Sequence, residues 1–195
     1  MNLVLASANR NKIREIGAIL PANFHLIGLQ DIGIHYEIPE PGLTIKENSF
    51  LKAAHVAEVL KKQGRTEFVF ADDSGMEVEA LEGAPGVFSA MYAGIPKNDT
   101  ANTNKLLGAL RYVENRRAQF ITIITLLVNG QAHYFEGSVK GVIAQEPKGD
   151  QGFGYDPVFI PEGYTHTFGE LSDDVKNSIS HRAKAIHLLI DFLKQ

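Results

Sequence analysis

A run of four apolar residues, 68–71, leads directly into Asp72 and Asp73, which Ser74 and Gly75 follow. Such a run is typical of a buried central strand. Two adjacent carboxylates at its end repel each other and lose hydration unless something compensates them. Mg²⁺ suits this role because it prefers carboxylate oxygen and keeps coordination positions for water and substrate. Open α/β sheets bind ligands at the carboxyl ends of their strands, so the junction predicts a metal site. The alternative is a solvated turn in which one aspartate caps the next element.

The composition limits the classes of protein that need to be considered. The 195 residues suffice for a single domain, 1–195, and are few for two. A net charge of −4 argues against a general nucleic-acid binder. The absence of cysteine excludes disulfides, thiolate nucleophiles and zinc–thiolate sites. No secretory signal and no bilayer-spanning run is recognisable, so we expect a cytoplasmic protein without membrane partners.

The apolar periodicity predicts strands at 2–6 and 25–29 and a helix between them that starts after the polar loop 7–11. Thr44 and Glu47 fit a capping box, and the helix that they open is expected to end near Lys62. These four elements alternate between strand and helix.

The second half of the chain adds a helix capped by Asp99 or Thr100 and a hairpin. The hairpin pairs 118–128 with 134–144 around an Asn129-Gly130 turn. One last helix is expected, with an apolar stripe from Ile179 to Leu193. An α/β fold with a mixed sheet follows from this order.

The loop 7–12 lies between the first strand and the first helix and is a candidate phosphate site. A helix N-terminus offers backbone N–H groups and a dipole that favours an anion. Lys12 lies in the first helical turn, where its side chain can reach a phosphate. The alternative is an ordinary Asn cap with Lys12 on the surface. The candidate residues are Ser7, Ala8, Asn9, Arg10, Asn11 and Lys12.

A second candidate segment is rich in glycine, from Gly149 to Pro157. Glycine permits close approach of the backbone to a ligand. Phe153 and Tyr155, which flank Gly154, could stack on a planar base there. The alternative is a turn with core aromatics.

Three cationic or donor side chains, Lys176, His181 and Arg182, lie around the start of the last predicted helix. Cations near a helix N-terminus work against the dipole, which favours a functional interpretation. Their N–H groups suit the carbonyl oxygen of a base or a phosphate. The alternative is a surface ion pair of Arg182 with Asp173 or Asp174.

Taken together, these segments resemble the inosine triphosphate pyrophosphatase family. Its Ser/Thr-x-Asn-x-x-Lys pattern is matched by 7–12, its Asp-Asp-Ser-Gly by 72–75, its Gly-Phe-Gly-Tyr-Asp-Pro by 152–157 and its Ser-His-Arg by 180–182. Each motif alone is weak, but four in this order over nearly the whole chain are specific. One departure is Met91, where the family often has arginine.

The resemblance implies an elongated mixed β-sheet flanked by helices, two lobes with a central cleft, and usually a homodimer. It implies Mg²⁺-dependent hydrolysis of non-standard purine nucleoside triphosphates, such as those of inosine, deoxyinosine and xanthosine. The products are a nucleoside monophosphate and pyrophosphate.

The resemblance also implies roles for single residues. Asp73 is the general base and a metal ligand, Glu40 is the second metal ligand, and Asp72 is a further candidate ligand. The loop 7–12 holds the triphosphate, and Lys12 offsets the charge of the leaving pyrophosphate. Ser74 is an additional substrate contact. The nucleoside site is formed by Phe153, Gly154, Tyr155, Asp156, Lys176, His181 and Arg182.

Two other interpretations remain open at this point. Maf-like nucleotide pyrophosphatases share the general architecture, but their first loop typically carries Ser-x-Ser-x-Arg-Arg, where this chain has Asn9 and Lys12. A nucleotide- or RNA-binding module without activity could use the same basic and aromatic loops. Such a module gains nothing from Asp72 and Asp73 unless a metal is present.

Overall fold

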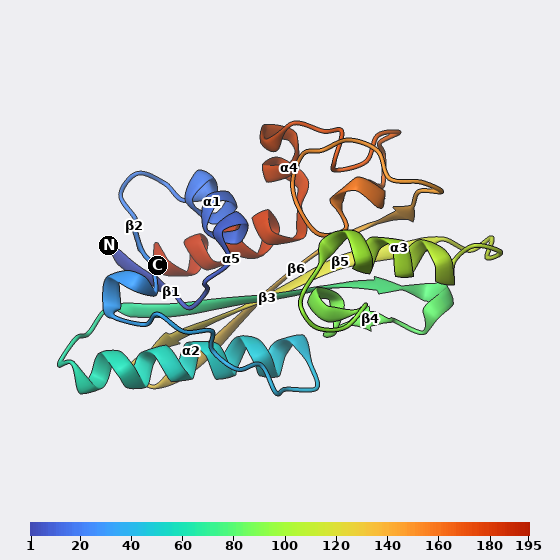
Figure 1. The fold of residues 1–195 in the computed structure, drawn as a ribbon. Coiled ribbons are helices and arrows are strands. Elements are labelled where there is room, and N and C mark those ends of the chain that lie inside the picture. The colour runs from blue at the N-terminus through green and yellow to red at the C-terminus, as the bar shows by residue number, and fades with distance from the viewer. The chain divides into compact units, whose positions relative to one another are not determined.

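The computed structural model describes all residues, 1–195, as an α/β protein with a seven-stranded mixed sheet and five α-helices (Figure 1). The strand order is β2-β1-β3-β5-β6-β7, and β4 pairs with β3. β1 is parallel to β2 and β3, whereas the β3–β4 and β6–β7 pairs are antiparallel. The predicted mixed sheet is thus confirmed. The strands are β1 Asn2–Leu5, β2 His25–Ile27, β3 Phe68–Val78, β4 Pro85–Gly86, β5 Arg117–Val128, β6 Gln131–Ile143 and β7 Phe159–Pro161.

The helices are α1 Arg10–Ile19, α2 Ile45–Lys62, α3 Asp99–Ala109, α4 Asp173–Ile179 and α5 His181–Leu193. None of them combines the length and apolar character that crossing a bilayer requires.

Contacts divide the chain into two compact units, which are described separately. Unit 1 comprises 1–73, 122–137 and 182–195, and unit 2 comprises 74–121 and 138–181. The predicted cleft between two lobes concerns the relative placement of these units and stays a prediction.

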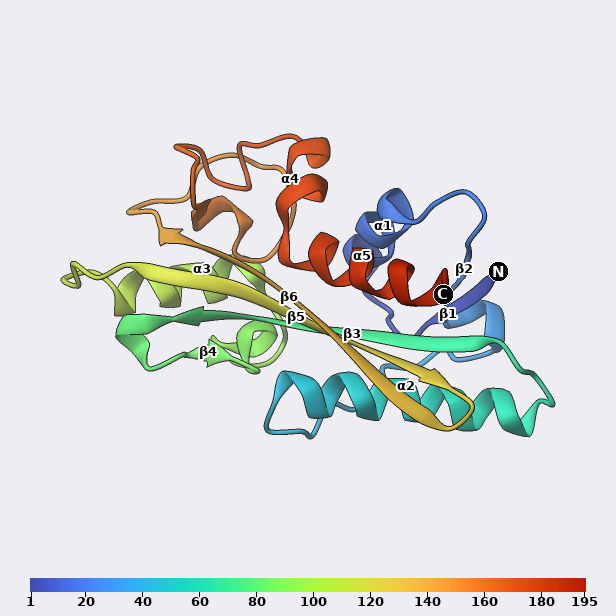
Figure 2. The same ribbon diagram turned by 180° about the vertical axis from the view of Figure 1, so that it is seen from behind.

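Unit 1 covers both faces of its strands with helices. Alternate side chains of a strand point to opposite faces, so β1 and β3 each contribute to two cores. Val69 and Ala71 belong to the core that includes Val56 and Leu60 of α2. Phe70 belongs to the core that includes residues of α1 and α5. Figures 1 and 2 show the same division, with α2 on one face and α1 and α5 on the other.

Unit 2 is built around aromatic side chains. The ring of Phe120 on β5 lies 4.8 Å from that of Phe159 and 6.2 Å from that of Phe168, measured between centroids. Leu106 of α3 and Leu110, the C-cap of that helix, belong to the same buried cluster. The result is a core of its own for unit 2.

Several local predictions are confirmed. Thr44 and Glu47 form a complete capping box, and α2 ends at Lys62. The hairpin turn falls at Asn129 and Gly130, whose φ angles are 50° and 79°, the left-handed values that such a turn needs.

Three boundaries differ from prediction. β3 does not end before Asp72 but continues to Val78, because its later residues still pair in the sheet, with Met76 and Glu77 opposite β4. The predicted last helix is two helices, since Ser180 takes an extended conformation (φ −66°, ψ 158°). Ile179 consequently packs in the core of unit 2 and does not belong to the α5 stripe. α3 is capped by Asn98, one residue before the predicted Asp99.

Arg116 connects its own chain segment to two others in unit 2. Its guanidinium donates to the carbonyl oxygens of Leu110 (2.8 Å), Ile143 (2.7 Å) and Ala144 (2.6 Å). The replacement Arg116→Ala leaves all three acceptors without this donor, so we expect the free energy of unfolding to fall by about 2–3 kcal/mol. Chemical denaturation measures this loss. Arg111→Ala, at an exposed position nearby, is the control and should stay within about 0.5 kcal/mol. Equal effects of the two changes would contradict the assignment.

Candidate functional site

Asp72 and Asp73 lie in the middle of β3 and point to opposite faces of the sheet. The alternation of β3 puts Asp72 on the face of Phe70, toward α1 and α5, and Asp73 on the face of Ala71, toward α2. Their partners agree, since Asp72 binds Lys12 and Asp73 binds Lys52. The expectation that one cation compensates both carboxylates is therefore wrong, because strand geometry separates them.

Asp72 belongs to a buried ionic network, which we call the Asp72 network: Glu15, Arg182, Asp72 and Lys12. The Lys12 ammonium lies 2.6 Å from Asp72 Oδ1, and Arg182 Nε donates to Asp72 Oδ2 at 3.0 Å. Arg182 Nη1 donates to Glu15 Oε2 at 2.5 Å. Of these residues Asp72 is 0% and Arg182 1% exposed. The predicted alternative, a surface pair of Arg182 with Asp173 or Asp174, is therefore wrong.

The electrostatics of the Asp72 network keep Asp72 ionised. Burial alone would raise the pKa of Asp72, but Lys12 and Arg182 lower it far below its ordinary value. Burial lowers the pKa of Lys12, although Asp72 opposes this shift. Both oxygens of Asp72 face cations of the protein, so Asp72 is poorly suited to bind a metal.

On the other face, Lys52 of α2 joins two carboxylates and a carbonyl group. Its ammonium donates to Glu40 Oε1 at 2.5 Å, to Asp73 Oδ1 at 3.0 Å and to the Asp72 carbonyl oxygen at 2.9 Å. Burial would lower the pKa of Lys52, but Asp73 and Glu40 raise it above its ordinary value. We call Glu40, Lys52 and Asp73 the Asp73 group.

The pKa of Asp73 is raised from its ordinary value. Burial is the main cause, and the nearby charge of Glu40 acts in the same direction. Lys52 and Lys12 oppose the shift without cancelling it. A carboxylate with a raised pKa is a better proton acceptor than an ordinary aspartate.

The two carboxylates of the Asp73 group suit Mg²⁺ when substrate and water supply its other ligands. Glu40 and Asp73 direct carboxylate oxygens toward the same cation, the Lys52 ammonium. No cluster of three or more His, Cys, Asp or Glu side chains could hold a metal by itself. Mg²⁺ usually takes one or two protein carboxylates and completes its shell with water and substrate phosphates. Glu40 and Asp73 match that pattern. Two carboxylates are too few to hold the metal without water and substrate.

The loop before α1 is organised by its own side chains. Asn9 is the N-cap, and its Oδ1 accepts from the N–H groups of Asn11 (3.0 Å) and Lys12 (3.2 Å). Ser7 Oγ accepts from the N–H of Asn9 at 3.2 Å. The predicted Asn cap is present, so two of the helix N–H groups expected to hold an anion already have an acceptor. The Lys12 ammonium remains the main phosphate candidate in this segment.

In unit 2, residues 152–156 form a loop with several internal contacts. We call it the base loop, after the nucleoside site predicted there. Asp156 Oδ2 accepts from the N–H of Phe153 at 2.7 Å and from the Lys176 ammonium at 2.5 Å. That ammonium lies 5.0 Å from the centroid of the Phe153 ring. The side chains of Asp156 and Lys176 are each 3% exposed. Phe153 is half-buried, which leaves part of its ring accessible.

Tyr155 and His181 are built into the core of unit 2. The Tyr155 hydroxyl donates to the Ser89 carbonyl oxygen at 2.9 Å, and burial raises the pKa of Tyr155 above its usual range. The His181 ring stacks on Phe120, with centroids 4.6 Å apart and planes at 8°. Of the two aromatic residues predicted to stack on a base, Phe153 is the better placed. Ser74 is half-buried on β3.

Two residues of these groups were missed by sequence reasoning, Lys52 and Glu15. Lys52 is a charged position on an otherwise apolar helical stripe, the α2 face of Ile45, Val56 and Leu60. A lysine at such a position requires a buried partner, so that signal was present in the sequence. Glu15 lies off the apolar stripe of α1, and no pattern in the sequence marks it as buried.

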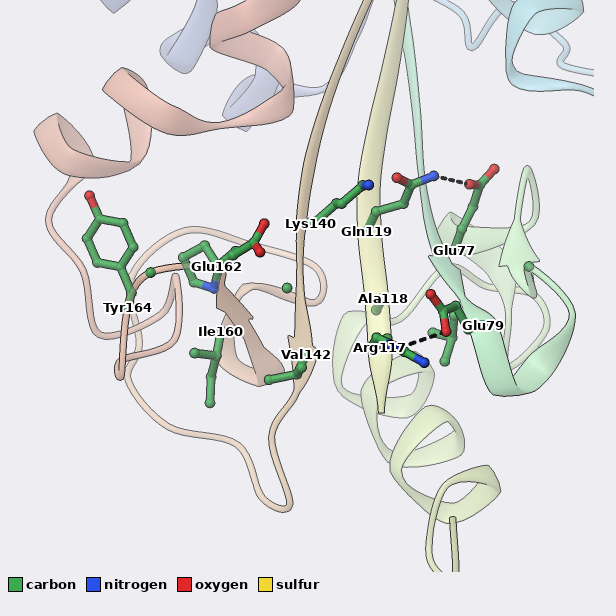
Figure 3. A pocket seen from close by; sticks show the side chains of 15 residues that line it. Glu77, Glu79, Arg117, Ala118, Gln119, Lys140, Val142, Ile160, Glu162 and Tyr164 are labelled. Carbon is green, nitrogen blue, oxygen red and sulfur yellow. Dashed lines mark hydrogen bonds and ion pairs between the residues drawn. The ribbon is translucent and has the colours of Figure 1, made fainter. Parts of the chain in front are cut away.

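A separate groove lies on the sheet of unit 2, formed by strands β3, β5, β6 and β7, with a volume of about 620 Å³. Figure 3 shows two of its carboxylates already bonded, Glu77 to Gln119 and Glu79 to Arg117. None of the predicted site residues lines it. We therefore assign it no part in the chemistry.

Arg182→Met tests the Asp72 network. It leaves Asp72 and Glu15 buried with one cation fewer, so we expect the free energy of unfolding to fall by about 3–5 kcal/mol. Adding Glu15→Gln to this variant removes one uncompensated charge and should recover part of the loss. Urea denaturation measures both, with the exposed Lys194→Met as control. A single variant as stable as the native protein would refute the network's contribution.

Comparisons with known proteins agree with this picture of the chain. The model of the Ham1 family matches residues 3–192. A dITP/XTP pyrophosphatase of Flavobacterium psychrophilum is 51% identical over 100% of both chains. One from Porphyromonas gingivalis is 49% identical over 98% of this chain and 96% of its own. The solved structure of the Staphylococcus aureus Ham1 protein superposes with a TM-score of 0.87 at 41% identity, covering 100% of this chain and 98% of that one. This chain belongs to the Ham1 family.

Proposed function

We propose that this chain hydrolyses non-standard purine nucleoside triphosphates, those of inosine, deoxyinosine and xanthosine, to a nucleoside monophosphate and pyrophosphate. The main structural support is the Asp73 group, in which a buried carboxylate of raised pKa adjoins a lysine and a second carboxylate. Relatives 49–51% identical over nearly their full length bear the name dITP/XTP pyrophosphatase. The match to the Ham1 family over residues 3–192 argues against the alternatives of a Maf-like enzyme and a non-enzymatic binding module.

Hydrolysis of a phosphoanhydride depends mainly on charge neutralisation and alignment. Lys12 and Lys52 supply two ammonium groups, which other side chains hold in fixed positions. In our proposal Lys12 binds the β- and γ-phosphates and offsets the charge that develops on the leaving pyrophosphate. Ser7, Ala8, Asn9, Arg10 and Asn11 surround the triphosphate, and Ser74 adds a hydroxyl group.

Asp73 is the proposed general base. It takes a proton from the water that attacks the α-phosphate, and its raised pKa makes it an effective acceptor for that proton. Glu40 and Asp73 are the proposed ligands of Mg²⁺, which when bound neutralises phosphate charge. Lys52 keeps the two carboxylates together, so it is a positioning residue as well as a cation for the phosphates.

The proposal assigns selection of the purine to aromatic and N–H donor side chains. In the proposal Phe153 stacks on the base, while Lys176, His181 and Arg182 provide N–H donors. A 6-oxo group accepts hydrogen bonds, whereas the 6-amino group of adenine donates them, so donors favour inosine over adenosine. Lys176 donates a buried hydrogen bond to Asp156, and Arg182 donates one to Asp72. These bonds limit how far either side chain can rotate toward a base. The backbone of Gly154 and the side chains of Tyr155 and Asp156 shape the loop.

Two further expectations accompany this function. We propose that the protein works in the cytoplasm, and that it forms a homodimer, as the resemblance implies. Analytical ultracentrifugation of the purified protein tests the dimer, and a single species of monomer mass at micromolar concentration would refute it.

Asp73→Asn should nearly abolish turnover of inosine triphosphate. The amide cannot accept the proton from water at neutral pH, and losing a positioned base costs about 10²–10⁴-fold in rate. Steady-state pyrophosphate release at saturating Mg²⁺ measures the effect. Asp191→Asn, on the exposed side of α5, is the matched control and should be unaffected. Native turnover by Asp73→Asn would remove Asp73 from the mechanism.

The first products should be inosine monophosphate and pyrophosphate. The expectation follows from placing Lys12 on the leaving β,γ-unit and the attack on the α-phosphate. Phosphorus NMR of the reaction distinguishes pyrophosphate from orthophosphate directly. Inosine diphosphate with orthophosphate would show that attack occurs at the γ-phosphate, and the proposed alignment would be wrong.

A further inference from the structure

Two side chains of α3 bind the N–H and the carbonyl group of Gly154 in the base loop. Asp99 Oδ2 accepts from the N–H of Gly154 at 2.9 Å. Thr103 Oγ1, one helical turn further along α3, donates to the Gly154 carbonyl oxygen at 3.4 Å. Residues four apart lie on the same face of a helix, so α3 contacts both sides of this glycine. Asp99 and Thr103 have no part in the chemistry described above.

These bonds constrain the residue next to Gly154, which is Phe153. The Phe153 N–H is bound by Asp156 at 2.7 Å, and the following N–H, that of Gly154, is bound by Asp99. Gly154 itself has φ +62°, in the left-handed region. Phe153 is thereby bracketed by two carboxylates, and the direction in which its ring leaves the backbone is set by both of them.

The hydrogen bond between Asp99 and Gly154 is distinct from the usual roles of an acidic residue at the start of a helix, which are capping and interaction with the helix dipole. Asn98 already caps α3, because its Oδ1 accepts from the N–H of Ala101 at 2.9 Å. An aspartate in the first turn also interacts favourably with the helix dipole, but that interaction does not depend on the base loop. A variant of Asn98 therefore weakens the start of α3 while leaving the Asp99–Gly154 bond in place.

We propose that Asp99 is a positioning residue, which fixes Gly154 so that the Phe153 ring is held ready to stack on the purine of the substrate. Thr103 supports the same peptide from the other side. The inference rests on the proposed function, since it assigns the base-stacking role to Phe153. It adds a residue on α3 that acts on substrate affinity through the backbone and touches no phosphate.

The test compares Asp99→Ala with Asp99→Asn and Asn98→Ala, using inosine triphosphate. Base–aromatic stacking contributes a factor of about 5–150 in affinity, and a misplaced ring loses part of it. We expect Asp99→Ala to raise KM about tenfold with kcat within about twofold. Asp99→Asn retains an oxygen acceptor for Gly154 and should keep KM within about threefold. Asn98→Ala should lower the melting temperature without changing KM.

A double-mutant cycle with Phe153→Ala separates this role from general damage to the fold. If Asp99 acts by placing the ring, Asp99→Ala has no further effect on KM once the ring is absent. An unchanged KM for Asp99→Ala, or an equal rise in the Phe153→Ala background, would overturn the proposal. Thr103→Val provides a second variant should Asp99→Ala fail to fold, and its KM should rise about threefold, with no rise counting against the proposal. Failure of the native protein to release pyrophosphate would instead refute the proposed function.

Discussion

The buried pair between Asp72 and Arg182 is the interaction on which unit 1 most depends. It connects the middle of β3 to the first turn of α5, and through Glu15 it also reaches α1. Charges that are this deeply buried are tolerated only when each has a partner. Lys12 completes the set on Asp72. The position of the proposed phosphate-binding ammonium is thus determined by ion pairs that also hold three secondary-structure elements together.

The alternation of side chains along β3 places its two adjacent aspartates in different environments. Asp72 is surrounded by cations and has a lowered pKa, whereas burial raises that of Asp73. Two identical side chains next to each other thereby acquire opposite properties, because a strand directs neighbours to opposite faces. A shift of one residue in the pairing of β3 would exchange their environments. The register with β1, in which Leu5 lies opposite Phe70, therefore matters for chemistry as well as for packing.

Much of the fold could be predicted from local patterns, because capping, turn chemistry and apolar periodicity act over a few residues. The capping box at Thr44 and the turn at Asn129 are examples. The end of β3 was mispredicted because two carboxylates look like a turn until their partners are known. Lys52 comes from a helix 20 residues away, and Arg182 is 110 residues distant from Asp72. The motifs identified Asp73, Lys12 and Phe153 as candidates, but only tertiary structure revealed what holds each of them.

Neither unit is one continuous stretch of chain, and this has a consequence for synthesis. Unit 2 ends at residue 181, whereas unit 1 needs 182–195 to be complete. During translation the chain emerges from its N-terminus, so β1, α1 and β3 are available long before α5. Until Arg182 leaves the ribosome, Asp72 and Glu15 lack their shared cation and cannot be buried at low cost. The proposed catalytic half of the protein is thus the last to be finished, although its first strand is the first to be made.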